Sequence, residues 1–118
     1  MKKVFYLSTC DTNKRILKEL AFGDDVELQD IKKENIDEKS LDFIKNKLGS
    51  YEALFSKRAM KYRSMGLNEM ELSEEDYKKY ILEEYTFLKR PFIILNDEVF
   101  VGNSKATIEA VKLAYHGN

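Results

Sequence analysis

The chain has 118 residues, of which 43% are hydrophobic and 35% are charged, and its formal net charge is −1. That length fits one domain with a sizeable core, and the balanced charge gives no attraction to nucleic acid. The apolar stretches fall far short of the about 20 residues of a membrane span. We therefore expect a soluble cytoplasmic protein with neither nucleic acid nor membrane as partner. A single cysteine, Cys10, and a single histidine, His116, exclude a disulfide framework, a metal site rich in Cys or His, and an internal dithiol.

The first 30 residues have the pattern strand, helix, strand. The segment Lys3–Leu7 is nearly all apolar, with β-branched and aromatic side chains, which is typical of a buried strand. Either Asp11 or Thr12 is the expected N-cap of the helix that follows. The helix has an apolar stripe made by Ile16, Leu17, Leu20 and Ala21. Val26–Leu28 then alternates as a second strand, and this order predicts a right-handed parallel crossover.

The middle of the chain, from about residue 37 to 85, contains no convincing strand. A first helix is indicated by the apolar positions Leu41, Ile44 and Leu48. Ser73, with Asp76 three residues later, has the pattern of an N-terminal cap with an acidic first turn. We expect the helix that follows this cap to end near Lys89-Arg90, directly before the only proline.

The last segment returns to strands. Phe92–Leu95 and Val99–Val101 are separated by a short turn, which predicts an antiparallel hairpin. Ser104 is a good N-cap for a final helix with one apolar face. Pro91 stands at the start of the third strand, where both the cis and the trans isomer are open.

The full order is βαβ, a helical insertion, then ββα, which is the order of a thioredoxin-like fold of the α/β class with a central mixed sheet. We therefore predict a single domain over residues 1–118. Residues 1–30 and 89–118 would form the thioredoxin-like core, and residues from about 35 to 88 the helical insertion.

Cys10 lies at the junction of the first strand and the first helix. The first N–H groups of a helix have no intrahelical partner and the macrodipole is positive there, so a thiol at this end is favoured as the reactive thiolate and an oxyanion can be held beside it. Lys14 and Arg15 add positive charge within the first turn and a half, whereas Asp11 opposes them. A lone cysteine is also commonly a small buried hydrophobe, but the position of Cys10 after two polar residues favours a reactive thiol.

Several segments, taken together and in order, resemble the arsenate reductase (ArsC)/Spx family. The segments are Thr9–Thr12 between strand and helix, Leu54–Arg58, Met65–Leu67, Leu88–Pro91 and Val101-Gly102. The resemblance spans nearly the whole chain. It implies a thioredoxin-like fold with a helical insertion.

The glutaredoxin-linked arsenate reductases of this family use a cysteine at this position to attack arsenate, with a histidine four residues before it and an arginine four residues after. Here Tyr6 and Lys14 stand at those places. Of three further family arginines, one is matched by Arg90, one falls on Ser56, and one is replaced by Val101–Asn103. The resemblance therefore implies a position closer to the branch for which a glutathione-dependent thiol reductase activity is the usual proposal, and arsenate reduction is the less favoured activity.

The resulting hypothesis is a thiol-dependent reductase, leaning toward an enzyme, with Cys10 as the catalytic nucleophile. The anion-binding or thiol-binding candidates are Thr12, Lys14, Arg15, Arg58, Arg90 and Pro91. No bound cofactor and no metal are expected. Because the chain has a single cysteine, an outside thiol must act as co-substrate and partner. This thiol is glutathione, another low-molecular-weight thiol or a glutaredoxin.

The alternative is a non-enzymatic, Spx-like adaptor that binds the α subunit of RNA polymerase. In this reading Cys10 is dispensable and the charged helical insertion makes the contact. The residue three positions after Cys10 is Asn13, which excludes the Cys-x-x-Cys switch that many Spx proteins carry.

Overall fold

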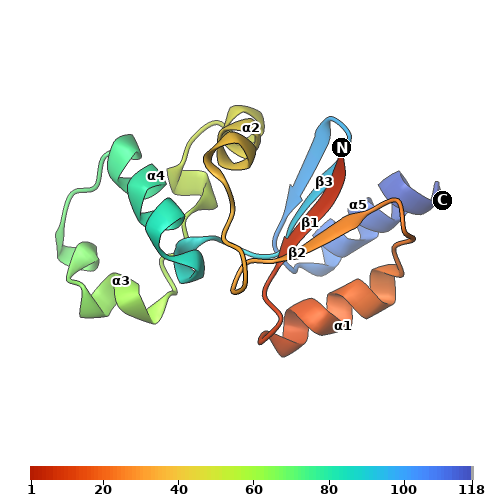
Figure 1. Cartoon of the computed structure of the whole chain (residues 1–118), viewed down its shortest axis with the longest axis horizontal. Helices are drawn as coiled ribbons and strands as arrows, with labels where there is room; N and C mark the ends of the chain where they lie inside the picture. The colour runs from red at the N-terminus through yellow and green to blue at the C-terminus, as the bar shows by residue number, and fades with distance from the viewer. Residues whose placement is uncertain (118) are drawn as a thin grey trace. The chain divides into compact units, whose positions relative to one another are not determined.

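The computed structural model describes residues 1–117 (Figure 1). None of the helices in that range is long and apolar enough to cross a membrane. The strands are β1 (Lys2–Tyr6), β2 (Glu27–Asp30), β3 (Phe92–Leu95) and β4 (Glu98–Val101). The helices are α1 (Asp11–Leu20), α2 (Glu38–Leu48), α3 (Met60–Ser64), α4 (Glu74–Glu83) and α5 (Lys105–His116), with short 3₁₀ turns η1 (Glu52–Leu54), η2 (Leu67–Glu69) and η3 (Tyr85–Phe87).

The chain divides into two compact units. The first unit contains Met1–Glu34 and the segment from Arg90 onward, and the second contains Asn35–Lys89. All four strands belong to the first unit, together with α1 and α5. The second unit is helical.

The sheet of the first unit has the strand order β2-β1-β3-β4. β1 and β2 are parallel, with Tyr6 opposite Asp30, as the predicted crossover requires. β3 runs antiparallel to both β1 and β4, with Phe5 opposite Phe92. The predicted mixed sheet and the α/β, thioredoxin-like order of elements are therefore confirmed.

Both helices of the first unit cover the same face of the sheet, as Figure 1 shows. Their apolar stripes pack on the inward side chains of β1 and β3, and each buried aliphatic side chain contributes roughly 1.5–3 kcal/mol. This core consists of Val4, Ile16, Leu20, Val26, Ile93, Leu95, Ile108 and Val111.

The ends of α1 differ from the sequence prediction. The N-cap is Cys10, with extended backbone angles, whereas Asp11 and Thr12 already lie inside the helix. The C-cap is Ala21, which adopts the left-handed conformation at φ 48°, although Gly23, two residues later, is the residue type that usually takes this position. Asp11 stabilises the first turn by its charge instead of by a capping hydrogen bond.

The second unit is built on an aromatic cluster. The ring of Phe55 stacks on Phe87 at 4.9 Å between centroids and meets the edge of Tyr77 at 5.0 Å. An isolated antiparallel bridge joins Phe55 to Leu88. The predicted cap of α4 is confirmed, because Ser73 and Asp76 form a reciprocal capping box.

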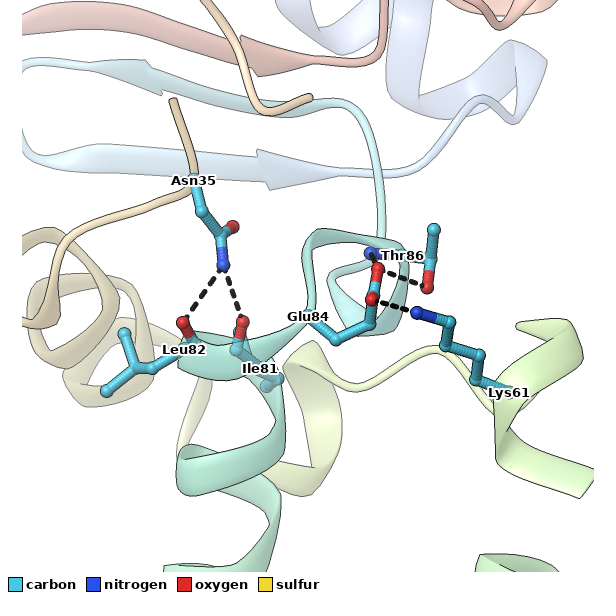
Figure 2. A network of polar contacts seen from close by, with 6 residues as sticks. All are labelled: Asn35, Lys61, Ile81, Leu82, Glu84 and Thr86. Carbon is cyan, nitrogen blue, oxygen red and sulfur yellow. Dashed lines mark hydrogen bonds and ion pairs between the residues drawn. The ribbon is translucent and has the colours of Figure 1, made fainter. Parts of the chain in front are cut away.

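α4 ends at Glu83, earlier than the predicted end near Lys89-Arg90. Asn35 takes up the last carbonyl groups, because its Nδ2 donates to the backbone oxygens of Ile81 at 2.9 Å and Leu82 at 3.3 Å (Figure 2). Glu84 then folds back to accept from the N–H and the hydroxyl of Thr86, and Lys61 pairs with the same carboxylate. These contacts turn the chain into η3 instead of continuing the helix.

Candidate functional site

One edge of the first unit's sheet gathers the residues that carry chemistry. β1 and β2 are parallel and β3 is antiparallel to them, so the carboxyl ends of β1 and β2 and the amino end of β3 meet at this edge. The loop from Leu7 to Cys10 leaves the edge from β1, and Arg90-Pro91 enters it before β3. Ligands of open α/β sheets bind in such positions, beyond the carboxyl ends of strands.

Cys10 is held by backbone hydrogen bonds on both sides. Its N–H donates to the carbonyl of Leu7 at 3.1 Å, and its carbonyl accepts from the N–H of Lys14 at 3.1 Å. The side chain is half-buried and takes no capping role. The thiol therefore stands at the positive end of a ten-residue helix, where N–H groups without an intrahelical partner can hold a neighbouring anion.

Asn13 lies within the buried stripe of α1. Its side chain is 1% exposed, and its Oδ1 accepts a hydrogen bond from the backbone N–H of Leu7 at 3.0 Å. This hydrogen bond fixes the loop that precedes Cys10 to α1. Asn13 occupies the position that a second cysteine takes in a Cys-x-x-Cys motif.

Asp30 grips the same loop from the end of β2. The residue is 8% exposed, and its Oδ1 accepts from the N–H groups of Ser8 and Lys32, both at 3.2 Å. Oδ2 is buried and has no hydrogen-bond partner within residues 1–117. Burial acts to raise the pKa of this carboxyl, but the nearby Ser8 side chain and the N–H groups of Ser8 and Lys32 outweigh it, so the pKa lies below its usual value and the group is charged at neutral pH.

The predicted cationic residues of α1 are exposed. Lys14 Nζ lies 3.6 Å from Oδ1 of Asp11, the carboxylate that the sequence places beside the thiol. Arg15 is exposed one residue further along the helix, and Thr12 is half-buried in the first turn. The charge of Lys14 is therefore shared between Asp11 and the helix N-terminus.

The peptide bond between Arg90 and Pro91 is cis, which answers the question that the sequence left open. Pro91 is buried, and its carbonyl accepts from the N–H of Gly102 at 3.0 Å. Arg90 is half-buried in the same unit as Cys10. Arg58 belongs to the second unit and is exposed in the turn before α3.

Two residues of this edge, Asn13 and Asp30, escaped the sequence prediction as parts of the site. Asn13 left a signal, because a polar residue interrupts the apolar spacing that continues through Ile16 and Leu20. For Asp30, the only indication in the sequence was its position at the end of a short strand.

A hollow of about 300 Å³ runs along β2 and is lined by Tyr6, Glu27, Leu28, Gln29, Asp30, Lys33 and Glu34.

No metal centre is formed by the part of the chain described here, residues 1–117. In that range no three His, Cys, Asp or Glu side chains are arranged as metal ligands would be. The chemistry that the edge itself offers is that of one thiol at a helix N-terminus.

Comparison with protein families gives a match over most of the chain. The model of the ArsC family matches residues 5–111. None of the curated proteins gives a match.

Solved structures share the fold. A YffB protein has a TM-score of 0.79 at 20% identity, covering 98% of this chain and 99% of that chain. An arsenate reductase from Vibrio cholerae has a TM-score of 0.74 at 15% identity, covering 93% of each chain. An arsenate reductase (ArsC) related protein from Brucella melitensis has a TM-score of 0.69 at 21% identity, covering 92% of each chain. At these identities the likeness concerns the fold.

Proposed function

The chain belongs to the ArsC family, and from this premise we propose that it is a thiol-dependent reductase whose nucleophile is Cys10. One observation carries the proposal. Cys10 is the N-cap of α1 at the sheet edge where Arg90-Pro91 leads into β3. A half-buried thiol in this position combines access for a substrate with the positive end of a helix.

The reaction is a thiol–disulfide exchange that an outside thiol completes. The Cys10 thiolate attacks one sulfur of a disulfide substrate, forms a mixed disulfide with it and releases the other sulfur as a thiolate. Glutathione, another small thiol or the thiol of a glutaredoxin then attacks the mixed disulfide and frees Cys10. A second molecule of the outside thiol attacks the disulfide formed in that step and releases the remaining half of the substrate as a thiol. Two outside thiols are thus oxidised to one disulfide for each substrate disulfide reduced.

A disulfide substrate fits this chain better than arsenate does. Arsenate carries concentrated negative charge, and planar guanidinium groups bind such oxyanions in a bidentate way. At the edge described above, Arg90 is the one matched family arginine, while Lys14 shares its charge with Asp11 at 3.6 Å. We therefore propose that the chain acts like the glutathione-dependent reductase branch, with arsenate as the weaker substrate.

A coupled turnover assay tests this function. The purified protein is given glutathione and the disulfide of 2-mercaptoethanol, and formation of oxidised glutathione is followed through glutathione reductase and NADPH. A parallel reaction replaces the disulfide with arsenate. We expect turnover with the disulfide, a mercaptoethanol adduct on Cys10 by mass spectrometry when glutathione is left out, and loss of both in Cys10→Ser. A wild-type protein that shows neither turnover nor adduct, or a Cys10→Ser protein of equal activity, would contradict the proposal.

The cycle needs a reduced thiol pool, which also bears on where the protein works. Reduced glutathione at high concentration is a property of the cytosol, and disulfide-forming compartments oppose such a cycle. We therefore propose a cytoplasmic location, which fractionation of the native cells would test.

A second candidate function, an adaptor for the α subunit of RNA polymerase, is favoured by one observation in the second unit. Met60, Met65 and Met70 are 89%, 49% and 55% exposed, beside the exposed Arg58 and Arg63. Exposed methionines are frequent on surfaces that bind other proteins. In this case a tagged Cys10→Ser protein retains the α subunit as well as wild type does, and Met60→Ser weakens the retention. Absence of the α subunit from both eluates would exclude the adaptor function.

A further inference from the structure

We propose that Asp30 is the positioning residue for Cys10. The inference rests on the proposed function, because it concerns the nucleophile of that reaction. Asp30 does not touch a substrate in this proposal. It acts through the backbone of Ser8, two residues before Cys10.

Four residues, Leu7 to Cys10, connect the end of the buried β1 region to the first turn of α1. Three of their N–H groups have identified acceptors: Leu7 donates to Asn13, Ser8 to Asp30, and Cys10 to the carbonyl of Leu7. Of these acceptors, Asp30 alone belongs to a neighbouring strand. It therefore ties the loop of Cys10 to the sheet, whereas the other two bonds tie the loop to itself and to α1.

Burying the charged Asp30 carboxylate costs solvation free energy, and this cost argues that the charge has a specific role. A buried ionised carboxylate loses solvation, and here one of its oxygens, Oδ2, is buried without a partner within residues 1–117. An N–H that donates to an ionised carboxylate makes a stronger hydrogen bond than one that donates to a neutral oxygen, by roughly a factor of two. A carboxylate at this position therefore holds Ser8 more firmly than an amide or a hydroxyl would.

A mobile loop would lower the reactivity of Cys10. The stabilising effect of a helix N-terminus on an anion falls off within the first turn, so the sulfur must remain at the N-cap to benefit from it. Loss of the tie to β2 leaves the Ser8–Cys10 segment free to move away from that place. The rate at which the thiol reacts is thus the quantity that Asp30 controls.

The test measures the second-order rate of alkylation of Cys10 by iodoacetamide, a small neutral probe. The variants are Asp30→Ala, which removes the acceptor, and Asp30→Asn, which keeps the acceptor Oδ1 and removes the charge. Asp25→Ala is the matched control, because Asp25 is a second carboxylate of the same unit that accepts two hydrogen bonds, in its case from the side chains of Tyr115 at 2.6 Å and Lys2 at 3.0 Å. We expect a loss of about five-fold in Asp30→Ala, the effect of one lost hydrogen bond of ordinary net strength, recovery to within about two-fold in Asp30→Asn, and no change in Asp25→Ala.

Two outcomes overturn the proposal. One is a folded Asp30→Ala protein that reacts at the wild-type rate. The other is equal slowing in Asp30→Ala and Asp30→Asn, because the conservative variant then restores nothing. If Asp30→Ala does not fold, amide hydrogen exchange of Ser8 decides: protection in wild type and Asp30→Asn supports the tie, and fast exchange in the wild type overturns it.

The alkylation readout separates this inference from the proposed function. Iodoacetamide reports the loop and the thiol without any turnover of disulfide or arsenate. A protein with no reductase activity but with the expected order of alkylation rates would contradict the proposed function and support the positioning role of Asp30. An active reductase whose alkylation rate is indifferent to Asp30 would do the reverse.

Discussion

The backbone N–H of Leu7 donates a hydrogen bond to Oδ1 of Asn13 at 3.0 Å. Asn13 stands three residues after Cys10, where a dithiol protein of this fold places its second sulfur. The position that would close a catalytic cycle within the chain is thus used to hold the loop of the nucleophile. An outside thiol remains the way to complete the proposed cycle.

Removing the Asn13 side chain should destabilise the protein. Asn13→Ala leaves the Leu7 N–H without its acceptor in a region that is almost fully buried, which costs about 1–3 kcal/mol of unfolding free energy. Urea unfolding followed by circular dichroism measures the loss. Asn46→Ala, an exposed asparagine in α2, is the control. A loss no larger than that of the control would show that the Leu7 bond contributes nothing.

Asn13→Cys should convert the external cycle into an internal one. Residues three apart in a helix are neighbours, so sulfurs at positions 10 and 13 come within bridging range. We expect the oxidised variant to show no free thiol and to lose the mercaptoethanol adduct that wild type forms. Thiol titration and mass spectrometry before and after reduction measure this. A variant that keeps two free thiols under oxidising conditions would contradict the expected geometry of the first turn.

Asp11 should lower the reactivity of the Cys10 thiol. Its carboxylate lies 3.6 Å from Lys14 Nζ and directly follows Cys10, so Asp11→Asn removes a negative neighbour and frees a positive one. We expect alkylation of Cys10 at neutral pH to become about two- to three-fold faster at low ionic strength, and the gain to shrink in about 1 M salt, where the screening length is about 3 Å. Asp97→Asn, an exposed acid in the β3–β4 turn, is the control. A gain that persists in high salt would point to a cause other than charge.

The sequence predicts the order of elements because the buried segments have clear periods. The apolar run at β1, the stripe of Ile16 and Leu20 and the cap at Ser104 each need only local information. The end of α4 was mispredicted because it depends on Asn35, more than 40 residues away, whose side chain takes the last carbonyl groups. Local propensity carries no trace of such a contact.

The candidate site divides in the same way. Cys10 is visible in the sequence because the single cysteine falls at the junction of a strand and a helix, where general principles favour a reactive thiol. Asp30 is not visible, because its role depends on parallel pairing that brings it opposite Tyr6 and within reach of Ser8. Asp11 or Thr12 was expected to cap α1, but the extended backbone ends at Cys10 and the helix begins at Asp11, so Cys10 is the N-cap.

Tyr51→Phe should weaken the second unit at neutral pH and have a smaller effect in acid. The Tyr51 hydroxyl donates to Asp42 at 2.6 Å, and this hydrogen bond, followed by Lys78, holds the pKa of Asp42 below its usual value despite desolvation. A depressed pKa in the folded state stabilises the protein above the ordinary carboxyl pKa of about 3.9, and the contribution disappears as the pH falls through the folded value. The difference in unfolding free energy between wild type and Tyr51→Phe should therefore be constant from pH 7 to 5 and shrink below about pH 4.

Tyr62→Phe is the matched control for that series. The Tyr62 ring packs on the edge of Phe55 at 5.7 Å in the same unit, and its hydroxyl makes no hydrogen bond with residues 1–117. Its unfolding free energy should follow wild type at every pH. Because both substitutions delete one phenolic oxygen, a pH-dependent difference confined to Tyr51→Phe isolates the bond to Asp42, whereas a parallel shift of Tyr51→Phe at all pH values would mean that the hydroxyl acts through packing and not through the charge of Asp42.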